Sequence, residues 1–284
     1  MKMKQLFTIL IVWVLQFMLS CNNVDSAKLS TEEKKKPGIT NNVDHESNKV
    51  FTINAEDILK DFMTWYTYSY NNIRLAQDFI GLDTDSSILN KNAFLNRLAT
   101  GNFVAFKIII RDDLPIYKLY KLSKTNADIQ NAIKQMASNE ISHYKMEGKE
   151  LPDYDFKDLN GNSYNKSATK GKTLVIKCWF IHCVACVKEF PELNKLVDKY
   201  KDRDDILFIS LAMDSKQDLI SFLNKRHFNY AVVPDKEEYM SKRLGITEYT
   251  THILVDKNEK IIKVVNTVSD LIPFIEKQTK KISL

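Results

Sequence analysis

The clearest pattern of hydrophobic and polar positions lies in the second half of the chain, where short apolar runs alternate with amphipathic stretches. Residues 173–180 form a nearly continuous apolar run, which predicts a buried central strand. Further strands are predicted at residues 206–213, 230–233, 252–255 and 260–265. Helices are predicted at residues 183–200, 216–225 and 270–280, and a hairpin around residues 160–162. This alternation predicts an α/β sheet with helices on both faces.

Residues 51–148 carry a different pattern, which predicts a smaller α+β, largely helical module. The predicted helices cover residues 55–78, 87–99 and 127–147, and a predicted hairpin pairs residues 103–110 with 115–122. Aromatic side chains such as Trp65 and Tyr66 follow the apolar face of the first helix, and we interpret them as core and rim packing rather than a ligand groove. No motif in this segment indicates a chemistry.

The amino terminus has the pattern of an export signal. Lys2 and Lys4 precede an apolar run of about 14 residues that ends at Leu19, too short for an ordinary spanning helix and typical of a signal-peptide core. The segment Met18-Leu19-Ser20-Cys21 resembles the lipobox of bacterial lipoproteins, although Met18 and Leu19 are less usual there. Residues 1–21 are therefore predicted to be a lipoprotein signal peptide with Cys21 as the lipidation site. An ordinary cleaved signal and a retained anchor are the alternatives.

Composition and charge predict a folded protein that does not bind nucleic acid. The chain has 284 residues, of which 44% are apolar, and this is enough to bury a core. Residues 22–50 are polar and rich in lysine, which predicts a flexible linker. The net charge of +5 comes from 41 basic and 36 acidic residues spread along the chain without a basic stripe. We interpret this charge as a solvated surface and predict no nucleic-acid partner.

The candidate chemistry lies in Cys183-Val184-Ala185-Cys186, where the predicted central strand meets a predicted helix. Structural zinc needs a second pair at matching spacing, which the sequence lacks, so we predict a redox dithiol with no metal and no cofactor. Unpaired backbone N–H groups at a strand-to-helix junction stabilise a thiolate, so Cys183 is the predicted nucleophile. Cys186, one turn further on, is predicted to be shielded and to resolve the mixed disulfide.

Three separated segments, LPDYDFKDLNG, TLVIKCWFIHCVACVKEFPELNKL and LGITEYTTHILVDKNEKII, resemble the TlpA/ResA-like branch of the thioredoxin superfamily. These proteins are membrane-tethered periplasmic thiol–disulfide oxidoreductases, many of them lipoproteins in Bacteroidetes. The resemblance covers about residues 149–284 and implies a thioredoxin-like fold, a central mixed sheet flanked by helices. It also implies that Trp179 precedes the active site, and that Glu189 and Pro191 belong to a kinked first helix.

Several positions depart from the family pattern. His182 replaces the usual tryptophan before the first cysteine; it either lowers the thiol pKa or assists proton transfer, or is an exposed, tolerated residue. Lys177 takes the place of the buried acid of thioredoxins, where it either stabilises the thiolate or points to solvent. Cys178 replaces a core phenylalanine and is interpreted as a small buried hydrophobic residue.

The largest departure is Thr250, which aligns with the family's cis-proline. A cis bond before another residue costs about 2.5–4 kcal/mol, so this loop either keeps the cis form under strain or has turned trans. In the family this loop pairs with the substrate through backbone groups and helps to exclude metal ions from the thiols. The resemblance therefore implies that loss of the proline weakens substrate docking and makes metal binding easier, with His182 and His252 as candidate ligands. His252 is otherwise expected to be a structural residue at a strand start.

We therefore carry three functional hypotheses. The first is a membrane-tethered thiol–disulfide oxidoreductase that acts on protein disulfides, with reduction as the expected direction and a membrane thiol donor or acceptor that recharges the pair. It would be lipid-anchored and would face the periplasm or the cell exterior. The second is a tethered protein- or metal-binding module with a redox-inactive thioredoxin fold. The third is a thiol peroxidase, which the sequence disfavours because Phe180 stands where that branch carries a threonine.

Overall fold

The computed structural model describes residues 49–50, 54–111, 114–122 and 127–280. The predicted signal peptide, Cys21 and most of the predicted linker lie outside these residues. Within the described part of the chain, none of the helices is both long enough and apolar enough to span a bilayer.

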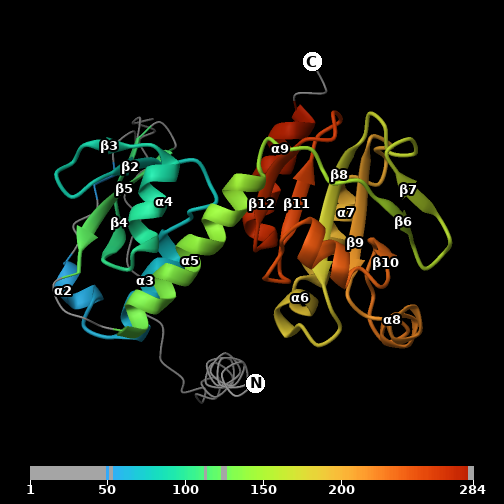
Figure 1. Ribbon diagram of the computed structural model, residues 1–284, viewed down its shortest axis with the longest axis horizontal. Coiled ribbons are helices and arrows are strands. Elements are labelled where there is room, and N and C mark those ends of the chain that lie inside the picture. Colours follow the sequence, from blue (N-terminus) through green and yellow to red (C-terminus); the bar gives the residue numbers. More distant parts are fainter. Residues whose placement is uncertain (1–48, 51–53, 112–113, 123–126, 281–284) are drawn as a thin grey trace, which may run out of the picture. The chain divides into compact units, whose positions relative to one another are not determined.

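The first part of the described chain contains a five-stranded sheet with the strand order β1-β4-β5-β2-β3 (Figure 1). Its strands are β1 (Lys49–Val50), β2 (Ile80–Leu82), β3 (Ile88–Leu89), β4 (Phe103–Arg111) and β5 (Leu114–Lys121). Its helices are α2 (Ala55–Ile58), α3 (Phe62–Asn72), α4 (Lys91–Ala99) and α5 (Ala127–Met146). The predicted hairpin of β4 and β5 and the predicted helix α5 are confirmed, whereas β1, β2 and β3 were not predicted.

The helix predicted at residues 55–78 is wrong in its extent. It is interrupted because Asp61 begins a new helix, with its Oδ1 accepting a hydrogen bond from the Thr64 N–H at 2.8 Å. It ends at Asn72 because the chain becomes extended at Ile73, which buries Ile73 and Leu75 in the core. The helix predicted from residue 87 begins only at Lys91, since Asn90 caps it and the two residues of β3 pair with β2.

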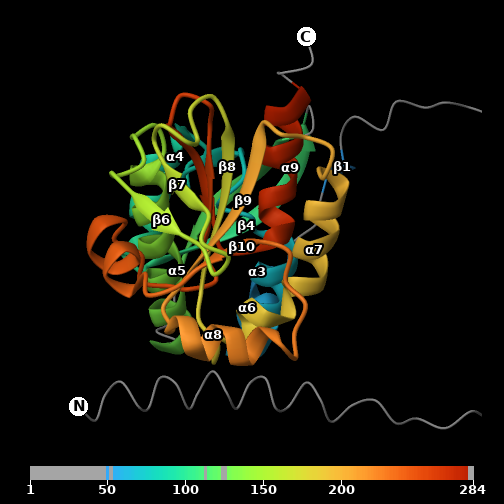
Figure 2. The same cartoon turned by 90° about the vertical axis from the view of Figure 1, so that its right-hand side faces the viewer.

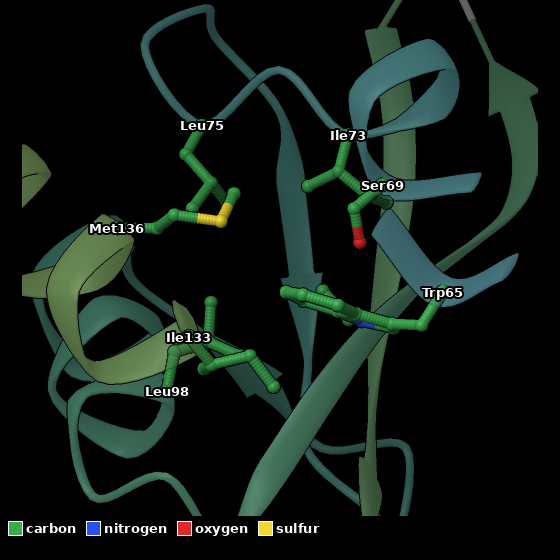
Figure 3. A pocket seen from close by; sticks show the side chains of 8 residues that line it. Trp65, Ser69, Ile73, Leu75, Leu98, Ile133 and Met136 are labelled. Atoms are coloured by element: carbon green, nitrogen blue, oxygen red, sulfur yellow. The ribbon is translucent and has the colours of Figure 1, made fainter. Parts of the chain in front are cut away.

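The aromatic residues of α3 contribute to this core. Trp65 is 2% exposed and lies beside a cavity of about 20 Å³ (Figure 3). The cavity is lined by Trp65, Ser69, Ile73, Leu75, Leu98, Ala105, Ile133 and Met136. A space of this size holds at most one water molecule, so the cavity is a packing defect rather than a ligand site.

The second part of the described chain is built on another five-stranded sheet, with the order β10-β9-β8-β11-β12 (Figure 1). The strands are β8 (Thr173–Trp179), β9 (Ile206–Ala212), β10 (Ala231–Val233), β11 (His252–Val255) and β12 (Ile261–Val265), preceded by a small hairpin of β6 (Asp155–Lys157) and β7 (Ser163–Asn165). The helices are α6 (Val184–Lys188), α7 (Phe190–Lys199), α8 (Lys216–Leu223) and α9 (Val268–Lys280), with a π-helical turn at Tyr239–Arg243. β8, β9 and β10 are parallel, and β11 is antiparallel to β8 and β12.

Both faces of this sheet are covered. α7 and α9 lie side by side on one face (Figure 2), where Leu193 and Leu271 join the buried cluster of Val175 and Leu254. On the other face, alternate residues of the same strands, among them Ile176, pack with β6 and the π-helical turn. The predicted fold class, a mixed sheet flanked by helices, is confirmed.

The helix predicted at residues 183–200 is two helices. α6 ends at Lys188, and α7 begins at Phe190 with Pro191 in its first turn. Proline has no N–H to donate to a preceding turn, and the first turn of a helix does not need that bond, so Pro191 fits at the start of α7. Glu189 therefore stands at the junction of the two helices, three residues after Cys186.

Candidate active site

The cysteine pair lies where the central strand β8 gives way to α6. Cys183 caps α6, and its N–H donates to the carbonyl of Phe180 at 3.0 Å, which closes a tight turn after the strand. The N–H of Cys186 points to the Cys183 Sγ at 3.2 Å. The two sulfurs form a disulfide with Cα atoms 5.3 Å apart. Strand, turn and helix thus fix both sulfurs at one point of the sheet edge.

The two sulfurs differ in their surroundings. Cys183 is half-buried and is followed by the exposed Val184 and Ala185. Cys186 is fully buried in a cluster with Trp179 and Phe190, and its Sγ lies 3.1 Å from the carbonyl oxygen of Tyr249. A partner sulfur can therefore approach Cys183, while Cys186 is reached only from within the protein.

Trp179 belongs to the buried cluster that contains Cys186. It is fully buried, and its ring meets those of Phe190 and Phe228 edge to face at centroid distances of 5.1 and 5.7 Å. These contacts hold the end of β8 against the start of α7. The sequence prediction that Trp179 belongs to the site rests on its place in the motif, and the structure puts its ring in the same cluster as Cys186.

Thr250 lies in a turn just before β11, and the structure records no cis peptide bond in the part of the chain that it describes. Of the two alternatives for this loop, the structure therefore adopts the trans form. The carbonyl of Tyr249 faces Cys186, and the next carbonyl, that of Thr250, accepts a hydrogen bond from the Lys177 Nζ at 3.1 Å. The turn thus connects Cys186 with the buried Lys177.

The alternative that Lys177 points to solvent is wrong. Its side chain is completely buried, and its Nζ lies 2.5 Å from the Glu189 Oε2 and 3.1 Å from the His252 Nε2. The His252 Nε2 lies 3.1 Å from the same carboxylate oxygen. Lys177 and His252 meet because they are register partners on β8 and β11. An ammonium cannot be left unpaired in this environment, which is why the lysine turns to Glu189 instead of to water.

The electrostatics of this cluster follow from burial and pairing. Burial opposes ionisation of Glu189, but hydrogen bonds and charge from His252 and Lys177 outweigh it and lower its pKa to about 2. Burial, followed by the Lys177 charge, lowers the pKa of His252 to about 4, so the ring is neutral at pH 7. Burial also lowers the pKa of Lys177, against the effect of the Glu189 carboxylate. The cluster therefore pairs one ammonium, that of Lys177, with one carboxylate, that of Glu189.

The remaining candidates lie apart from this cluster. His182 is exposed on the turn before Cys183. Among the residues that the structure describes, no group of three or more His, Cys, Asp or Glu side chains is arranged to hold a metal ion. Cys178 is a buried free cysteine, and burial raises the pKa of its thiol to about 12. Such a thiol does not supply a thiolate at pH 7, in agreement with its interpretation as a core residue.

The comparisons with known proteins concern this second part of the chain. The Redoxin family model matches residues 146–274. The thiol-disulfide oxidoreductase ResA of Bacillus thuringiensis subsp. konkukian is 32% identical over 121 residues, which are 42% of this chain and 69% of that protein. The chain belongs to the ResA-like thiol–disulfide oxidoreductases.

Two further similar proteins are a second ResA and a solved structure. The ResA of Bacillus anthracis is 30% identical over 117 residues, which cover 41% of this chain and 67% of that protein. The thioredoxin domain of a thiol-disulfide oxidoreductase from Bacteroides vulgatus, a crystal structure, is 27% identical and covers 46% of this chain and 96% of its own, with a TM-score of 0.42. The segment that the Redoxin family model matches contains the cysteine pair, Lys177, Glu189 and His252.

The cluster of Lys177, Glu189 and His252 was not predicted from the sequence. A buried charge was detectable at Lys177 because a lysine interrupts an apolar strand. The partners of Lys177 are set by the register of β8 and β11 and by the break between α6 and α7. Neither feature can be predicted from the local sequence.

Proposed function

We propose that this ResA-like oxidoreductase reduces disulfides in other proteins outside the cytoplasm, with Cys183 as the attacking and Cys186 as the resolving cysteine. The observation that carries the proposal is the difference between the two sulfurs, one half-exposed at the start of α6 and one buried next to it. A dithiol with this arrangement exchanges with a partner and then closes on itself.

The exchange conserves electrons and protons. The Cys183 thiolate attacks one sulfur of a substrate disulfide, forms a mixed disulfide and releases the other substrate sulfur as a thiolate, which takes up a proton. Cys186 then loses its proton and attacks the Cys183 sulfur, which forms the intramolecular disulfide and releases the second substrate thiol. The protein loses two electrons and the substrate gains them. A dithiol partner in the membrane restores the reduced pair by the reverse exchange.

The predicted export signal supports the location. Residues 1–21 with Cys21 would supply a lipid anchor, residues 22–50 a linker, residues 51–148 a module of unknown role and residues 149–284 the redox domain. The redox centre would then work in the periplasm or at the cell exterior, where disulfides form and need repair.

The test is a titration of the full-length protein, in detergent, against glutathione buffers, with alkylation and mass analysis of Cys183 and Cys186. We expect a reversible two-electron transition below about −200 mV, whereas a value near −120 mV would make the protein an oxidant. Cys178→Ala serves as the matched control and should leave the transition in place, because its thiol is buried away from exchange. A pair that shows no transition in any buffer contradicts the proposal.

A redox-inactive binding module is the competing function, and Thr250 at the cis-proline position favours it. If it holds, Cys183 and Cys186 form a static bridge, and changing both to serine leaves partner binding intact. A transition in the glutathione titration excludes this function.

A further inference from the structure

Three ionisable side chains from three different elements meet behind the cysteine pair. Lys177 comes from β8, His252 from β11 and Glu189 from the junction of α6 and α7. Lys177 and His252 are both fully buried, and each lies within 3.1 Å of the Glu189 Oε2. The other oxygen of Glu189 accepts a hydrogen bond from the N–H of Val268, at the start of α9, at 2.9 Å. The position of the Glu189 carboxylate is therefore fixed by Lys177, His252 and the Val268 N–H.

This cluster is connected to the resolving cysteine by two short routes. Glu189 follows Cys186 by three residues, and its N–H donates to the Cys186 carbonyl at 3.3 Å. The carbonyls of Tyr249 and Thr250, which are consecutive, contact the Cys186 Sγ and the Lys177 Nζ, each at 3.1 Å. A change of charge in the cluster therefore acts on Cys186 through these buried contacts, where water screens little.

Reduction of the disulfide creates thiols, and above their pKa values it creates negative charge at this place. A lone buried carboxylate beside the sulfurs would oppose that charge and favour the disulfide. Lys177 places a positive charge 2.5 Å from this carboxylate. We propose that Lys177 is a positioning residue of the redox centre: it neutralises Glu189 and holds the Thr250 carbonyl, and it thereby stabilises the thiolate form of the cysteine pair.

The other groups around the cluster do not take over this role. His252 is neutral at pH 7 and serves as a hydrogen-bond partner of Glu189. Tyr230, near Glu189, is fully buried, and burial raises its pKa, so it stays protonated. The Asp270 carboxylate on α9 lies near His252 but pairs with the Thr267 Oγ1 at 2.8 Å. Lys177 is therefore the cation that balances Glu189.

The inference rests on the proposed function, and its test compares reduction potentials of the full-length protein between pH 6 and 9. Lys177→Met keeps the length of the side chain and removes the charge. Above the thiol pKa we expect the equilibrium constant for reduction by glutathione to fall about tenfold, which is about 30 mV for a two-electron couple. At the acid end, where the thiols are protonated, we expect the difference from wild type to disappear.

A charge-balance cycle separates this effect from damage to the fold. Glu189→Gln alone should raise the equilibrium constant, and Lys177→Met combined with Glu189→Gln should restore it to within about twofold of wild type. Lys263→Met is the matched control: this lysine is 4% exposed and lies in the same sheet, but its Nζ pairs with Glu147 at 2.9 Å. We expect it to leave the potential unchanged.

The following results would contradict the inference. A Lys177→Met protein with the wild-type potential across the pH range overturns it, as does a double variant shifted as far as Lys177→Met alone. If Lys177→Met does not fold, an unchanged potential in Glu189→Gln overturns the inference equally well. A wild-type protein with no redox transition overturns the proposed function and the inference with it, whereas an unaltered Lys177→Met potential overturns the inference alone.

Discussion

At the scale of single residues, the proposed roles of the two cysteines predict different defects when each one is replaced by serine. Cys186→Ser leaves Cys183 able to attack but removes the sulfur that resolves the mixed disulfide. Because the intramolecular step replaces a slow bimolecular one, turnover should fall on the order of 10³-fold or more and a mixed disulfide should accumulate. Mass spectrometry of protein incubated with a disulfide-bonded substrate detects that species.

Cys183→Ser is the matched variant for this experiment. It should lose turnover to the same extent but trap no substrate, because the remaining sulfur of Cys186 is fully buried. Equal trapping by the two variants would show that either cysteine can attack, and the assignment of roles would be wrong.

The buried histidine gives a second prediction at this scale. In the unfolded chain His252 titrates near its ordinary value of 6.5, whereas in the folded protein burial lowers its pKa to about 4. The unfolded state therefore binds the proton first, and stability is full above pH 6.5 and declines as the pH falls towards 4. The loss from one such group is at most about 1.4 kcal/mol per pH unit.

Denaturant unfolding at a series of pH values measures this slope. His252→Gln can still donate to Glu189 and should make the decline between pH 6.5 and 4 shallower. His143, whose pKa burial also lowers to about 4, keeps part of the slope in this variant. The exposed His182→Gln is the control and should retain the full slope; an undiminished slope in His252→Gln would contradict the assignment.

At the scale of elements, the sequence predicted those whose signals are local. The buried strand β8, the hairpin of β4 and β5 and the helix α5 lie within a residue or two of their predicted ends, because apolar runs and helical spacing decide them. The short strands β1, β2 and β3 carry too few residues to show a period, and they form only through their partners. The cluster at Lys177 was not predicted for the same reason, because only the register of β11 on β8 brings His252 next to Lys177.

The break between α2 and α3 provides a prediction for an element. Asp61 accepts hydrogen bonds from both the N–H and the hydroxyl of Thr64, each at 2.8 Å. Asp61→Ala removes this cap and should lower the free energy of unfolding by about 1 kcal/mol, as loss of such caps does in general. Asn54→Ala at the start of α2 is the control, because the Asn54 side chain accepts no hydrogen bond from a backbone N–H and makes only an exposed one to the Asp57 Oδ2, at 2.6 Å. An equal loss in both variants would mean that the cap is not the cause.

At the scale of the whole molecule, the location of the protein decides which partners the redox centre meets. The fold and the cysteine pair were predictable because a family motif spans them, whereas the location rests on residues 1–21 alone. If Cys21 is acylated, the protein should label with a radioactive fatty acid and sediment with membranes. Because one acyl chain binds a bilayer only weakly, stable anchoring requires the two or more chains that a lipoprotein cysteine carries.

Cys21→Ser separates the anchor from the chemistry. The variant should lose the label and leave the membrane fraction, or remain there with an uncleaved signal, while the glutathione titration of Cys183 and Cys186 stays unchanged. Ser20→Ala, which keeps a small residue before the cysteine, should label like the wild type. Unlabelled wild-type protein would remove the lipid anchor from the proposed function and leave the redox chemistry as proposed, since the thiol exchange takes place at Cys183 and Cys186 and not at Cys21.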